Sequence, residues 1–109
     1  MAVVNQYKFY GTNLVTTDET ILLTTAATEN FIIKSLRVTN NTGNTPTITL
    51  TNNSINIVNT QTLVANASIE ILTLPMIIES STSLKVTMSS VDSVDIGISY
   101  LNILKEVTA

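Results

Sequence analysis

The chain contains no cysteine, no histidine and no tryptophan, and it has only three glycines. Without cysteine there can be no disulfide and no thiolate metal ligand. Without histidine, the usual base that activates a serine or cysteine nucleophile is missing. Three isolated glycines, at positions 11, 43 and 97, do not form a glycine-rich phosphate loop. These absences exclude the commonest nucleophilic, zinc-binding and phosphate-binding sites.

Charge is also scarce, because only 12% of the residues are charged, whereas an ordinary soluble domain carries about a quarter. The net charge is -3, and the five basic residues are scattered along the sequence. They form no basic patch that would attract a phosphate backbone. No apolar run approaches the length of about 20 residues that crosses a bilayer. We therefore expect neither nucleic acid nor a membrane as a partner.

Threonine, asparagine and serine take the place of the missing charges, while hydrophobic residues make up 44% of the chain. Neutral hydroxyl and amide groups keep a surface hydrated without making it repel its neighbours. They also cost less to desolvate than charged groups when two surfaces meet. This composition favours a protein that lives in a dense, permanent assembly, and we expect a homo-oligomer.

The pattern along the chain predicts strands and almost no helix. β-branched residues dominate, and apolar residues alternate with polar ones. The clearest cases are Ser83–Ser89 and Val94–Tyr100. Further strands are expected at Tyr7–Val15, Thr20–Thr24, Phe31–Thr39, Thr47–Thr51, Ile55–Leu63 and Ser68–Thr73. The length and the regular turn signals predict one all-β domain over residues 1–109, an antiparallel β-sandwich of jelly-roll or Ig-like type with about eight strands.

Two positions depart from simple alternation. Lys34 shares a face with the apolar residues Ile32 and Leu36, so we expect a β-bulge there or a lysine that extends to solvent. Pro75 interrupts an apolar stretch, and we expect a corner at which the chain changes sheet.

Acidic residues offer the remaining candidates for chemistry. Asp18 and Glu19 are adjacent and fit a solvated turn, and nothing resembles a sugar-hydrolysing cleft around them. Asp92 and Asp95 could contribute to a calcium site, but two carboxylates at this spacing do not match an EF-hand loop. We expect no enzyme, no catalytic residue, no metal and no cofactor.

The most pointed apolar feature is the aromatic cluster of Tyr7, Phe9 and Tyr10. It fits either ordinary core packing of a first strand or an N-terminal arm over residues 1–8 that packs on a neighbouring subunit. Beyond Tyr100 both faces of the last strand turn apolar, which predicts cover on two sides. The candidate interface residues are Val3, Val4, Tyr7, Phe9, Tyr10, Leu101, Ile103 and Leu104.

The order of several short motifs resembles that of a known group of proteins. These motifs are Ile33–Asn40, Thr47–Leu50, Leu63–Asn66, Ile77–Glu79, Ser83–Val86 and Val94–Leu101. Together they resemble the small β-sandwich structural proteins of tailed bacteriophages, which often decorate or cement the capsid. The chain departs from that pattern at Ser80–Thr82, where a Gly-Asp pair is common.

The resemblance implies a non-enzymatic virion protein that binds the major capsid protein and reinforces the shell, with a trimer as the favoured oligomer. It transfers no catalytic residue. An alternative is a neck, tail or fibre module that recognises a host glycan. The asparagine-rich segments 40–44 and 52–59 keep this alternative open.

Overall fold

The computed structural model describes residues 3–105, and for residues 3, 4 and 105 it describes the backbone alone. This part of the chain is all-β and contains nine strands. In chain order they are β1 (Val3–Leu14), β2 (Thr20–Thr24), β3 (Glu29–Asn40), β4 (Thr47–Asn52), β5 (Ile55–Thr62), β6 (Ser68–Glu70), β7 (Met76–Ile78), β8 (Ser83–Met88) and β9 (Val94–Lys105).

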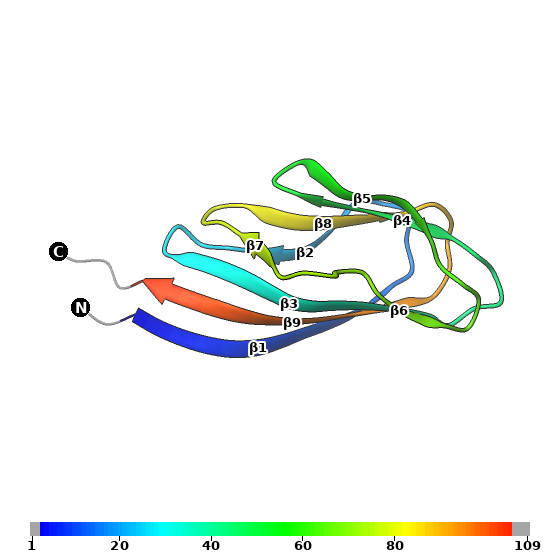
Figure 1. Cartoon of the computed structure of the whole chain (residues 1–109). Helices are drawn as coiled ribbons and strands as arrows, with labels where there is room; N and C mark the ends of the chain where they lie inside the picture. Colours follow the sequence, from blue (N-terminus) through cyan, green and yellow to red (C-terminus); the bar gives the residue numbers. More distant parts are fainter. Residues whose placement is uncertain (1–2, 106–109) are drawn as a thin grey trace.

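The strands form two antiparallel sheets that pack as the layers of a β-sandwich (Figure 1). Sheet A has the order β1-β9-β3-β6, and β7 also pairs with β3 beyond the end of β6. Sheet B has the order β2-β8-β4-β5. The predicted all-β sandwich is thus confirmed. The three longest strands, of 12 residues each, lie side by side in sheet A as β1, β9 and β3.

The core lies between the sheets, where alternation places every second residue. In β8 the inward residues are Leu84, Val86 and Met88, and in β9 they begin at Val94 and continue through Tyr100, as the alternation predicts. The ring of Phe31 packs against that of Tyr100 at a centroid distance of 4.7 Å. Both sheets thus contribute buried side chains to one core.

The expected bulge in β3 is present, because the register of β3 against β9 shifts between Ile33 and Ser35. Ile33 is buried before the shift and Leu36 after it, so the inward face changes from odd to even positions while Lys34 stays exposed. The Glu70 carboxylate holds the bulge by accepting hydrogen bonds from the Leu36 backbone N–H at 2.7 Å and from the Ser35 hydroxyl. A side chain from a neighbouring strand therefore satisfies the backbone that the bulge leaves unpaired.

The expectation at Pro75 is wrong. The strands on either side of it, β6 and β7, both pair with β3, so the chain stays in sheet A there and crosses to sheet B only before β8. The sequence reading also missed β7 as a strand. Its three residues form too short a run for alternation to show.

The turns differ in where the backbone adopts a positive φ. Gly43, in the turn between β3 and β4, does not adopt one. Positive φ occurs in other turns, at Asn53, Asn66 and Ser81. Asn40 organises the Gly43 turn, since its buried side chain binds the carbonyl of Asn44. The structure contains no helix within residues 3–105 that is long and apolar enough to span a membrane.

Candidate functional site on the outer face of sheet A

An apolar row crosses the outer face of sheet A. Because paired residues in antiparallel strands share a face, the registers place Tyr7 beside Leu101, Leu101 beside Ile32, and Ile32 beside Ile77. Tyr7 is 77% exposed and Ile77 is 59% exposed, while Leu101 and Ile32 are half-buried. We call these four residues the apolar row. Nothing within residues 3–105 covers its two ends.

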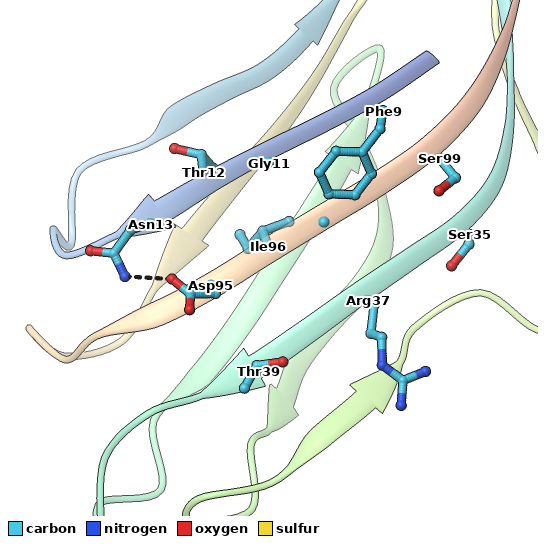
Figure 2. A pocket seen from close by; sticks show the side chains of 11 residues that line it. Phe9, Gly11, Thr12, Asn13, Ser35, Arg37, Thr39, Asp95, Ile96 and Ser99 are labelled. Carbon is cyan, nitrogen blue, oxygen red and sulfur yellow. Dashed lines mark hydrogen bonds between the residues drawn. The ribbon is translucent and has the colours of Figure 1, made fainter. Parts of the chain in front are cut away.

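A groove lies on the same face, beside the apolar row. Its volume is about 570 Å³, and its floor includes Gly11 and Gly97, which face each other across β1 and β9. In Figure 2 the ring of Phe9 projects from β1 toward β9, and 70% of this side chain is exposed. A Cβ atom on Gly11 would stand 3.0 Å from Cε2 of the ring. Glycine at these positions therefore leaves room for the ring against the sheet.

Polar side chains line the far end of the groove. Asp95 accepts a hydrogen bond from the Asn41 side-chain amide at 2.9 Å and another from that of Asn13 at 2.8 Å. These bonds, with Asn41 contributing more, hold the pKa of the Asp95 carboxyl below its ordinary value. Figure 2 also shows Arg37 on β3 and Ser35 further along that strand. The groove thus combines an aromatic ring and a fixed carboxylate, while Arg37 lines its β3 side with its guanidinium extending away from both.

The structure brings part of the predicted interface set together. Tyr7, Phe9, Leu101 and Ile103 all lie on the outer face of sheet A, by the registers of β1, β9 and β3. Tyr10 does not join them, because it points to the opposite face and packs against the core.

The other three predicted residues lie at the ends of the paired strands. Leu104 has the inward parity of β9 but is 40% exposed, near the strand end. The backbones of Val3 and Val4 pair with Lys105 and Leu104, and their side chains lie outside the described residues. The sequence predicts that the end of β9 beyond Tyr100 is covered on both faces. In the structure Asn102 is buried on the inward face there, whereas Leu101 and Ile103 are only half-buried on the outer face.

Of the predicted N-terminal arm over residues 1–8, the structure describes residues 3–8. Residues 3–8 form the first half of β1 and pair with β9. Since β1 lies at the end of the strand order in sheet A, this segment is neither a core strand nor detached from the domain. Residues 1 and 2 lie outside the described part of the chain.

Sequence reasoning missed Ile32, Ile77 and Arg37. Simple alternation groups Ile32 with Leu36, whereas the bulge at Lys34 places Ile32 on the outer face and Leu36 in the core. Ile77 belongs to the strand that went unrecognised. The run Phe31-Ile32-Ile33 was the available signal, since three consecutive apolar residues in a strand must place one of them on the outer face.

The hypothetical calcium site finds no support in the geometry. Asp92 accepts hydrogen bonds from Asn44 at 2.8 Å and from Ser90 at 2.7 Å, and the Asp95 oxygens are engaged by amides. Within residues 3–105, no group of three or more acidic, histidine or cysteine side chains could hold a metal ion. Glu19, from the other acidic pair, forms an exposed ion pair with Lys85 at 3.5 Å.

Comparison with protein-family models finds no match, and neither does comparison with curated proteins. The geometry described above and the resemblance in motif order are therefore what a functional proposal can rest on.

Proposed function

We propose that this protein is a non-enzymatic structural component of a tailed-phage virion, most specifically a decoration protein that binds the major capsid protein and reinforces the shell. The observation that carries this proposal is the apolar row Tyr7, Leu101, Ile32 and Ile77 on the outer face of sheet A. Exposed apolar patches of this kind mark sites of protein association.

The chemistry around the apolar row supports a permanent contact. Burying apolar surface contributes roughly 25 cal/mol per Å². Several flanking positions carry uncharged side chains, with Ser99 and Ser35 on one side and Asn5 and Asn30 on the other. Glu79 lines the same surface beside Ile32 and Ile77, and Lys34 is exposed at the bulge. Desolvation of the uncharged groups costs little compared with that of charged groups. The resemblance in motif order supplies the identity of the partner in this proposal, which is the major capsid protein.

The test is binding of the purified protein to expanded phage heads that lack it. We expect a fixed stoichiometry and a higher melting temperature of the heads. The double variant Tyr7→Lys/Ile77→Lys should lose this binding, because it places charges at both exposed ends of the apolar row. Val91→Lys is the matched control, since Val91 is 71% exposed but lies in the turn between β8 and β9. Heads that bind neither the wild type nor the control would refute the proposal.

A second candidate function is glycan recognition by a neck, tail or fibre module, and the groove is the observation that favours it. The apolar face of a sugar can stack on the exposed ring of Phe9, and the long side chain of Arg37 can turn toward the groove to donate to its hydroxyls. A carboxylate offers about four acceptor positions, so Asp95 retains capacity beyond its bonds to Asn13 and Asn41.

A glycan array separates the two candidates. Binding that disappears in Phe9→Ala and Arg37→Ala, but persists in Val91→Lys, would favour the glycan module. The absence of any bound glycan at high micromolar protein would remove this second candidate and leave the first unaffected.

A further inference from the structure

Most edges of the two sheets carry features that hinder pairing with another strand. The edge strand β2 has only five residues, and its register shifts between Ile21 and Leu23. The edge strand β5 has two register shifts against β4, and Thr60 within it adopts a positive φ of 50°. On the far side of sheet A, β6 and β7 have three residues each and are separated by a segment that contains Pro75. Short strands, bulges and prolines are the usual protection of sheet edges.

The remaining edge, β1, has almost none of this protection. It has 12 residues, and its register against β9 runs from Val3 to Leu14 without a shift. It contains no proline, and its only charged residue is Lys8. Within residues 3–105 no strand pairs with its other side. A long, regular and almost uncharged edge leaves backbone N–H and C=O groups directed at a further strand.

We propose that β1 pairs antiparallel with β1 of a second copy of this chain, about a two-fold axis at Phe9. The proposal deepens the function proposed above, on which it rests, by naming one contact inside the assembly. A two-fold contact uses the same patch on both subunits. It therefore joins the two A sheets into one continuous sheet and makes a dimer, where the resemblance favours a trimer.

The register follows from the length and the charge of β1. The midpoint of Val3–Leu14 falls between Lys8 and Phe9, so the longest overlaps are centred on one of these two residues. An axis at Lys8 would place the two Lys8 ammonium groups directly opposite each other, which is destabilising. An axis at Phe9 places Lys8 opposite Tyr10 of the second copy and pairs residues 4–14, so the charges are not opposed.

The Phe9 register is also complementary in its side chains. It places the two Phe9 side chains opposite each other and sets Tyr7 opposite Gly11 of the second copy, beside the ring that lies against that glycine. Asn5 then faces Asn13 of the second copy, and both of these residues are exposed on the outer face. Aromatic and amide pairs on one face stabilise neighbouring strands. The two apolar rows would lie on the same face of the joined sheet.

Engineered disulfides test this register, because the chain has no native cysteine. In the double variant Asn5→Cys/Asn13→Cys, each introduced thiol faces its counterpart in the second copy at a Cα separation of about 4.5–5.5 Å, which suits a disulfide. Within one chain the two positions lie eight residues apart, or about 26 Å in an extended strand. A disulfide within one subunit is therefore excluded.

We expect mild oxidation to convert the double variant into a covalent dimer on a non-reducing gel, while each single variant stays monomeric on that gel. A mixture of the two single variants should give the covalent dimer again. The wild type should sediment as a dimer at micromolar concentration. A wild type that remains monomeric at several hundred micromolar, or a dimer whose double variant does not cross-link, would overturn the pairing.

The outcome is separable from that of the proposed function. A monomer that still binds phage heads would refute the pairing and retain the decoration role. A cross-linked dimer that ignores phage heads would support the pairing and refute that role.

Discussion

The ring of Phe9 lies over Gly97 of the neighbouring strand, where a Cβ atom on Gly97 would stand 3.1 Å from Cε1 of the ring. Two of the three glycines of the chain, Gly11 and Gly97, face each other at this place. Glycine in a strand is generally unfavourable because of its larger loss of conformational entropy. Its presence here keeps the ring against the sheet and the groove open.

Replacement of Gly97 by alanine should change the groove without unfolding the domain. The new methyl group must displace the Phe9 ring, which can move because it is mostly exposed. Lower unfolded-state entropy offsets the lost contact. We expect the free energy of unfolding from urea denaturation to change by no more than about 1 kcal/mol. Glycan binding, if the array shows any, should be lost in Gly97→Ala. A loss of several kcal/mol would show that the ring cannot yield.

Loss of Glu70 should destabilise the bulge of β3. In Glu70→Ala the Leu36 backbone N–H loses its charged acceptor in a partly buried place. A hydrogen bond to a charged group contributes about 1.5–3 kcal/mol, so we expect a loss of that order in urea denaturation. Glu19→Ala is the control, since the exposed pair with Lys85 should contribute only about 0–1 kcal/mol. Equal losses in the two variants would contradict this role of Glu70.

Acid should weaken the domain through Asp92 and Asp95. Hydrogen bonds, led by Asn44 for Asp92 and by Asn41 for Asp95, lower the pKa of each carboxyl below the ordinary value of 3.8. The unfolded chain therefore binds protons more readily, and stability falls as the pH drops from near that value through the folded pKa. Melting temperatures measured from pH 7 to pH 2 should show this decline.

The variant Asp95→Asn is the control for the acid effect. It cannot titrate at position 95, so the difference in melting temperature between pH 7 and pH 2 should shrink. Its stability at pH 7 should also fall, because an amide cannot accept from Asn13 and Asn41 as a carboxylate does. An unchanged pH difference would show that Asp95 does not contribute to the acid sensitivity.

Tyr7 and Ile98 should differ sharply in what they contribute to stability. Ile98 is fully buried, and Ile98→Ala should cost about 2–5 kcal/mol. Tyr7 is mostly exposed, so Tyr7→Ala should change stability by no more than about 0.5 kcal/mol. Denaturation curves of both variants measure the contrast. A large loss in Tyr7→Ala would mean that this side chain serves folding instead of association.

Alternation predicted the inward residues of β8 and β9 correctly, because a strand that is half-buried must place every second residue in the core. It failed in β3, where Glu70 and the Lys34 bulge exchange the two faces partway along the strand. It also failed in β7, where Ile77 pairs with Ile32 of β3, 45 positions earlier in the sequence. In both places a contact with a distant residue overrides the local pattern.

The candidate site was predictable only in part. Tyr7, Phe9, Leu101 and Ile103 stood out as apolar residues near the ends of the chain, and the pairing of β1 with β9 places them on one face. Ile32, Ile77 and Arg37 come from other strands. Their place on that face depends on strand order, which no local stretch of sequence specifies, and on the bulge, which the sequence offers at Lys34 only as one of two alternatives.

The sequence by itself determined the fold class of this protein, because a sparsely charged chain rich in β-branched residues, with apolar and polar residues in alternation, forms a β-sandwich. Only the tertiary structure decided which face gathers the exposed apolar residues and which sheet edge is long and regular. The physical reason is the distance along the sequence over which each kind of interaction acts. Alternation and turn propensity act between neighbours in sequence, whereas a face and an edge are defined by hydrogen-bond registers between strands far apart in the chain.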